Sequence, residues 1–145
     1  MAYQHKESDL TVIMRAKDLC AYVFTITQKC PKQFRFTFVS RLQNLTLNVI
    51  ENLYRANSTF ISDFEEPGRR ENLQKRLDYQ HCAFTELKIM AFISHIAYLE
   101  KCILSKQLEQ IAKKSLDCER LLGAWITSDR KRYAETKKAQ RNFAN

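Results

Sequence analysis

Apolar residues recur along this chain at alternating spacings of three and four positions, which is the pattern of one face of an α-helix. In the first segment, residues 8–30, the apolar stripe comprises Val12, Ala16, Leu19, Val23 and Ile26. The opposite side is polar, so the pattern predicts an amphipathic helix. Ser8 and Asp9 provide a cap and a negative charge at its start, and Pro31 ends it because proline disfavours helical backbone at the residue before it.

Three further segments show the same periodicity. The second helix is predicted over residues 34–61 and the third over residues 69–103, with a turn at 63–68 between them. The fourth helix is predicted to begin at Ser105, and its apolar pattern ends at Ser128. The three predicted stripes are Phe38, Leu42, Leu45, Val49, Leu53, Ala56 and Phe60; Leu73, Leu77, Phe84, Leu87, Ala91, Ile96 and Leu99; and Leu108, Ile111, Leu116, Leu121, Leu122, Trp125 and Ile126.

Four long helices with short connections predict an all-α fold, an antiparallel up-down-up-down four-helix bundle. We expect residues 1–128 to form the bundle and residues 129–145 to form a basic C-terminal tail. The composition agrees, because 145 residues with only two Gly and two Pro are too poor in turn residues for a β-sandwich or barrel. The same shortage excludes a glycine-rich phosphate-binding loop.

The cellular compartment is predicted from hydropathy and from cysteine usage. No apolar stretch typical of a signal peptide follows the first residues, and the longest apolar run, Leu121–Ile126, is far shorter than the ~20 residues of a membrane-spanning helix. The five cysteines are widely spaced and contain no Cys-x-x-Cys motif, which predicts reduced thiols. We therefore expect a soluble, cytoplasmic protein without a membrane partner.

The sequence contains no recognisable enzyme or metal motif. The histidines do not form the paired Glu-x-x-His motifs of a di-iron bundle. His81 and Cys82 are adjacent, so their side chains diverge by about 100° on a helix and cannot share a metal ion. Glu51 and Glu86 are expected to pair with arginine inside the bundle or at a subunit seam, with a catalytic carboxylate dyad as the alternative. We predict no catalytic residue, no metal ligand and no cofactor.

The formal net charge of +8 is unevenly distributed. Residues 129–145 carry six basic and two acidic residues, which is half of the excess. Such a tail can neutralise phosphates and release counterions, or it can serve only as a solubilising segment.

A second basic set is interleaved with aromatic residues: Lys29, Lys32, Phe34, Arg35, Phe36, Phe38, Arg41, Tyr54 and Arg55. A third basic cluster has acidic residues interspersed in it, and we expect it to form salt bridges at the start of the third helix. It comprises Arg69, Arg70, Lys75 and Arg76.

The mixture of cations and aromatic rings in the second set is typical of surfaces that bind single-stranded nucleic acid. The alternative interpretation places the phenylalanines in the core and the cations on a solvated face. That alternative is favoured for Phe38, which fits the apolar stripe, whereas Phe34 and Phe36 can also form an intersubunit contact.

Two parts of the sequence resemble the Avd-like proteins, the accessory variability determinants of diversity-generating retroelements. The first is residues 9–19 (DLTVIMRAKDL), and the second is residues 34–45 (FRFTFVSRLQNL) with its continuation at 49–57 (VIENLYRAN). The wider family includes four-helix proteins encoded in bacterial ribosomal-RNA intervening sequences, whose second helix carries an Asn-Ile-Ala-Glu-Gly-like element. The matching residues 48–52 (NVIEN) keep the Asn and the Glu but lack the Gly, which favours the Avd branch.

The resemblance covers nearly the whole chain except the tail and is strongest over residues 9–57. It implies a barrel-shaped homopentamer without catalytic residues that binds the reverse transcriptase of the element and its template RNA or DNA for mutagenic retrohoming. Cations would hold phosphates rather than read bases. The predicted nucleic-acid-binding residues are Arg35, Arg41, Arg55, Lys113, Lys114, Arg120, Arg130, Lys131 and Arg132.

Two other hypotheses remain open at this stage. The first is a stand-alone RNA-binding or ribosome-associated four-helix-bundle protein. The second is a structural oligomer with an acidic protein partner, for which charge reversals in the tail would leave nucleic-acid retention unchanged.

Overall fold

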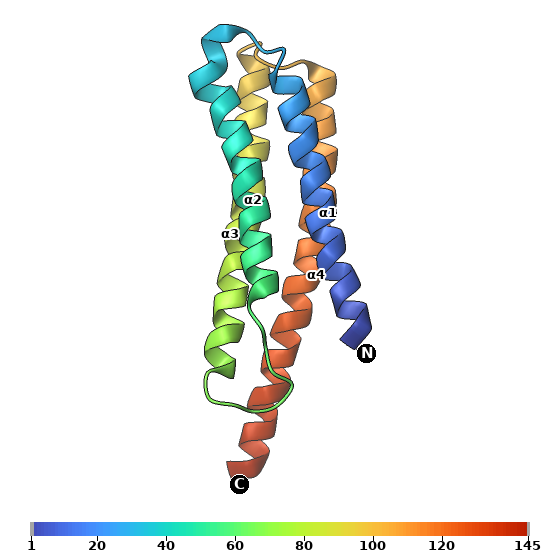
Figure 1. Cartoon of the computed structure of the whole chain (residues 1–145), viewed down its shortest axis with the longest axis vertical. Coiled ribbons are helices and arrows are strands. Elements are labelled where there is room, and N and C mark those ends of the chain that lie inside the picture. Colours follow the sequence, from blue (N-terminus) through green and yellow to red (C-terminus); the bar gives the residue numbers. More distant parts are fainter. Residues whose placement is uncertain (1, 145) are drawn as a thin grey trace.

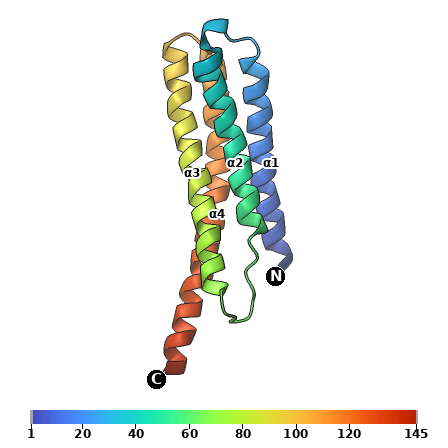
Figure 2. The same cartoon turned by 60° about the vertical axis from the view of Figure 1, so that its left-hand side comes forward.

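Four long helices make up the computed structural model, which describes the backbone of residues 2–144 and the side chains of residues 11–132. They are α1 (Ala2–Thr27), α2 (Ser40–Ser58), α3 (Arg69–Leu99) and α4 (Ser105–Ala144), and no strand occurs in the described backbone. Figures 1 and 2 show them running alternately up and down, and each helix contacts two others in the cyclic order α1, α2, α3, α4. The predicted all-helical fold with four main helices is therefore confirmed.

The core lies along the bundle axis and receives side chains from every helix. Val12, Leu53, Leu87 and Leu122 are fully buried. All five residues of the stripe predicted for the first helix are also buried. Sequence periodicity succeeds here because α1 has one apolar face and one polar face, so burying the apolar face fixes the rotation of the helix. The backbone is already helical from Ala2, so the helix start predicted at Ser8 and Asp9 is wrong; the side chains of these two residues lie outside those described.

The predicted second helix is wrong at both ends. Its first residues form a 3₁₀ turn, Lys32–Phe34, and a π-helical turn, Arg35–Val39, before α2 begins. Phe34 and Phe38 pack against each other in this segment with ring centroids 5.6 Å apart, and both are half-buried. The helix ends at Ser58 because Thr59 is extended, so Phe60 is 77% exposed instead of lying in the core.

The α3–α4 turn ends α3 at Leu99, four residues earlier than predicted. Lys101 has a left-handed backbone with φ of 65°, the conformation that commonly ends a helix. The amide of Cys102 donates to the carbonyl of Ala97 at 2.8 Å, which satisfies one of the last free carbonyls of α3. The start of α4 agrees with the prediction, although its end-capping contact comes from Gln107, whose Oε1 accepts from the Leu104 amide at 2.8 Å.

Helix α3 carries apolar side chains on two opposite sides. One side, including Leu87, Met90 and Ala97, is buried in the core. A second stripe with heptad spacing faces outward, and we call it the outer α3 stripe: Cys82, Thr85, Ile89, Phe92, Ile96 and Leu99. Leu99 was predicted to be a core residue but is 61% exposed, and Leu116 on α4 is likewise exposed. By length and composition alone α3 is also long and apolar enough to cross a membrane, although its apolar residues do not form one uninterrupted run.

Helix α4 continues without interruption past Ser128 to Ala144. Asp129, the first residue of the predicted tail, is fully buried and accepts hydrogen bonds from Arg76 Nε at 2.9 Å and Gln80 Nε2 at 2.8 Å. Arg76 was assigned from sequence to a salt-bridged surface cluster, but it is buried and lies over the Trp125 ring at 5.0 Å. The division between bundle and tail stays a prediction, because the side chains beyond Arg132 are not described.

Candidate nucleic-acid interface

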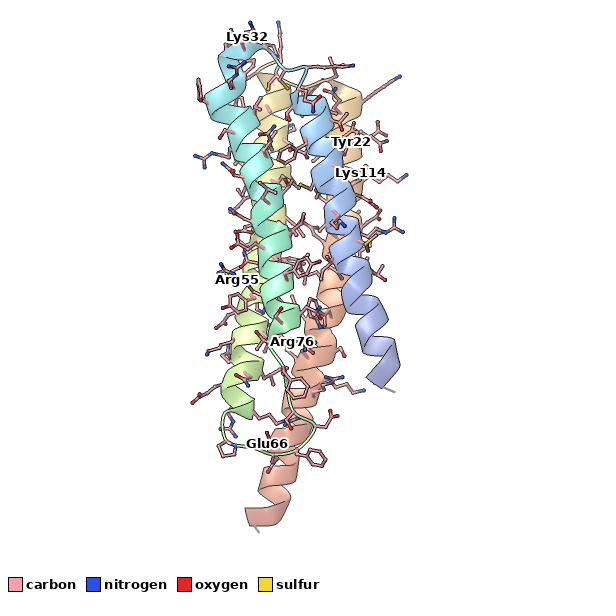
Figure 3. The ribbon with its side chains drawn as sticks, in the orientation of Figure 1. Tyr22, Lys32, Arg55, Glu66, Arg76 and Lys114 are labelled. Atoms are coloured by element: carbon pink, nitrogen blue, oxygen red, sulfur yellow. The ribbon has the colours of Figure 1, made fainter. Side chains whose placement is uncertain are left out.

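The connections at the two ends of the bundle differ in charge. The α1–α2 connection and the α3–α4 turn lie together at one end, where Lys32 is labelled in Figure 3. Exposed cations from both connections meet there, with Glu100 beside them: Lys29, Lys32, Arg35, Lys101 and Lys106. The α2–α3 connection carries exposed Asp63, Glu65 and Glu66, and Glu66 is labelled at the opposite end in Figure 3. The end with the two short turns, which we call the basic end, therefore favours an anionic partner.

Lys101 and Lys106 were not among the residues selected from sequence. The topology could have identified them, because an up-down-up-down bundle places its first and third connections at the same end. Cations at the α3–α4 connection are therefore expected beside those of the α1–α2 connection.

Phe36 forms the most exposed aromatic position among the described side chains, with 88% of its surface accessible. It stands between two hollows of about 550 and 240 Å³, and its ring contributes to the lining of both. The first hollow also contains Lys32, Arg35 and Gln43, and the second contains Arg41 and Asn48. No aspartate or glutamate lines either hollow. We refer to Phe36 and its two hollows as the Phe36 ridge.

The structure brings two of the predicted binding residues, Arg35 and Arg41, to the Phe36 ridge. Both are exposed, one on either side of the aromatic ring. Arg55 lies farther along α2, and its Nη2 forms an ion pair with Glu51 Oε1 at 2.6 Å (Figure 3). Glu51 therefore offsets part of the positive charge that Arg55 presents on this surface.

The other predicted cations are distributed along α4. Lys113 and Arg120 are exposed, whereas Lys114 is half-buried with its Nζ 5.5 Å from the centre of the Tyr22 ring on α1 (Figure 3). Nearer the other end, Arg130 Nη2 lies 2.9 Å from His81 Nε2, Lys131 is exposed, and Arg132 is half-buried. The nine residues therefore do not form one continuous patch. The cations of the tail beyond Arg132 lie outside the described side chains.

One half-buried acidic group, Glu86, lies between α3 and α2. Glu86 Oε2 accepts a hydrogen bond from Asn52 Nδ2 at 3.2 Å. Burial raises the pKa of Glu86, the hydrogen bond from Asn52 partly opposes that rise, and the charge of Glu51 adds to it. Glu51 pairs with an arginine, but on the exposed surface of α2 rather than inside the bundle, whereas Glu86 accepts its hydrogen bond from an asparagine.

The cysteines are free thiols in the structure, as expected from their spacing. Burial raises the pKa of Cys102 and of Cys118 to about 12, so neither thiol ionises near neutral pH. Cys82 is exposed on the outer α3 stripe. Among the described residues no group of three or more His, Cys, Asp or Glu side chains is arranged to hold a metal ion.

Comparison with known proteins gives a fold relationship. No family model matches the sequence, and no curated protein matches it. One similar solved structure is that of a protein of unknown function from the S23 ribosomal protein family of Bacteroides thetaiotaomicron VPI-5482. The two structures align with a TM-score of 0.67 at 12% sequence identity, covering 83% of this chain and 98% of the other. At this identity the likeness establishes a shared helical fold.

Proposed function

We propose that this chain is a non-enzymatic accessory subunit of a diversity-generating retroelement, which binds template RNA or DNA and the reverse transcriptase of the element. The basic end of the bundle is the observation that carries the proposal. Cations from two connections, far apart in sequence, gather there beside an exposed aromatic ring. Such a surface attracts phosphates through counterion release and does not depend on base sequence.

Assembly into a homopentamer is part of the same proposal, and the outer α3 stripe supports it. Its spacing of three and four residues over nearly five turns is the pattern of a helix that packs against another helix. Phe92 is 68% exposed at its centre. Glu86 lies on one side of the stripe and Lys88 on the other. A neighbouring protomer would therefore contact an apolar surface with an acidic residue along one edge and a basic residue along the other. A soluble chain rarely leaves such a stripe uncovered.

A closed ring needs a second, different surface on each protomer. Exposed Leu47 and Tyr54 on α2 provide one. They follow Gln43 by four and eleven residues, which places them on the same side of α2 as Gln43. Gln43 Nε2 donates to Thr27 on α1 at 2.9 Å, so that side faces α1, away from the outer α3 stripe. We assign the stripe of one protomer to the α1–α2 side of the next.

The proposed function is tested by co-purification of the tagged chain with the reverse transcriptase encoded beside its gene, with and without RNase. We expect the two proteins to be recovered together, and template RNA to be recovered with them only when RNase is omitted. A variant carrying Arg35→Glu and Arg41→Glu should retain the reverse transcriptase but recover less RNA. The proposal is wrong if the chain recovers neither the reverse transcriptase nor the RNA.

The alternative function is a stand-alone RNA-binding or ribosome-associated bundle, and the fold shared with an S23 ribosomal protein family member favours it. The neighbourhood of the gene discriminates between the two functions. A reverse-transcriptase gene with paired template and variable repeats supports the accessory subunit, whereas co-sedimentation with ribosomes in the absence of such a gene supports the alternative.

A further inference from the structure

The Phe36 side chain is placed differently from its two aromatic neighbours in sequence. Phe34 and Phe38 are turned toward each other and pack against the core, whereas Phe36 projects outward from the π-helical turn that also contains Phe38. Single π-helical turns at the start of an α-helix are frequent at functional sites. Leaving a phenylalanine ring in water gives up the stabilisation that its burial would bring. The ring is therefore accessible to a ligand, and its place in a π-helical turn between two hollows distinguishes it from the other exposed phenylalanines.

The surroundings of the ring define the chemistry of its ligand. The flanking hollows combine cationic and amide side chains: Lys32, Arg35 and Gln43 on one side, and Arg41, Asn44 and Asn48 on the other. An apolar peptide would leave these groups without partners, and an acidic peptide would leave the ring uncovered. A chain of alternating phosphates and flat aromatic bases satisfies both kinds of group.

We infer that the Phe36 ridge binds unpaired nucleotides, with a base stacked on the Phe36 ring and the adjacent phosphates held by Arg35 and Lys32 on one side and by Arg41 on the other. This inference rests on the proposed function in that it identifies the form of nucleic acid bound at the basic end. A duplex cannot bind in this way because its bases are already stacked on each other. The ridge therefore selects loops, ends and single strands without selecting their sequence.

The inference is tested by fluorescence anisotropy of the full chain with two labelled probes, an unstructured 12-nucleotide RNA and a blunt 12-base-pair RNA duplex. Phe36→Ala should weaken binding of the single strand about 5- to 150-fold, as expected for the loss of one stacked base. The affinity for the duplex should change little. Phe36→Trp should preserve binding of the single strand because its ring also stacks.

Phe64→Ala provides the matched control, because this phenylalanine is 76% exposed in the acidic connection at the opposite end. It should leave both affinities unchanged. The far-ultraviolet circular dichroism of each variant should equal that of the natural chain, since neither ring contributes to the core.

The outcomes separate the inference from the function on which it rests. If the natural chain binds neither probe, the proposed function and the inference both fail. If the natural chain binds RNA but Phe36→Ala lowers the affinities for the duplex and the single strand equally, the inference fails while nucleic-acid binding stands. The same holds if Phe36→Ala changes neither affinity.

Discussion

Asp129→Ala is expected to lower the free energy of unfolding by about 3–5 kcal/mol, since it removes one partner of a buried ion pair. The carboxylate of Asp129 is fully buried and accepts hydrogen bonds from Arg76 and Gln80 on α3. Its removal would take the Asp129 carboxylate away from the Arg76 guanidinium, which is buried beside the Trp125 ring. Urea denaturation followed by circular dichroism measures the change.

An exposed ion pair in the same protein supplies the control. Arg55→Ala breaks the pair between Arg55 and Glu51, whose side chains are both more than half exposed. The expected loss is below about 1 kcal/mol, because solvent screens exposed pairs. Replacing the buried pair as a whole, with Arg76→Met and Asp129→Leu, should restore much of the stability lost in Asp129→Ala. Equal losses for Asp129→Ala and Arg55→Ala would contradict this account of the ion pair.

Phe92→Glu is expected to dissociate the proposed homopentamer into single chains. The substitution places a negative charge at the centre of the outer α3 stripe and removes an aromatic side chain whose burial contributes about 1.5–3 kcal/mol at each seam. Light scattering should give about five times the chain mass of 17.1 kDa for the natural protein and the mass of one chain for the variant. The helix content should not change, since Phe92 is 68% exposed within its own protomer.

Phe60→Glu is the matched control for the assembly. Phe60 is as exposed as Phe92 but lies in the α2–α3 connection, away from the stripe. It should leave the assembly intact. A natural protein that already has the mass of one chain, or a Phe92→Glu variant that keeps the assembled mass, would rule out the outer α3 stripe as the seam.

Sequence periodicity predicted the helices where each helix has a single apolar face. The stripe of α1 is buried as expected. On α3 the same reasoning selected Ile96 and Leu99, although Met90 and Ala97 occupy the core. Both sides of α3 are apolar, so spacing alone cannot determine which of them faces inward. Only the packing of the other three helices decides this.

The candidate site was predicted only in part, for a similar reason. The order of cations and aromatic residues identified the segment around Phe36, and the apolar stripe assigned Phe38 to the core, but the sequence could not separate the outward ring of Phe36 from its inward neighbour Phe34. That separation depends on the π-helical turn, which has no simple periodic signature. The Arg76–Asp129 pair was also missed, because its members lie 53 positions apart and each belongs to a charged stretch that suggested solvent exposure.

The most direct test of the central claim is the affinity of the purified chain for a structured RNA, measured by anisotropy between 50 and 200 mM salt. If the basic end binds phosphates, about six contacts should make the affinity fall on the order of 10³-fold over this range. Arg35→Glu combined with Arg41→Glu should weaken binding at low salt and reduce the slope. An affinity that does not depend on salt, or no affinity for RNA at any salt concentration, would contradict the account.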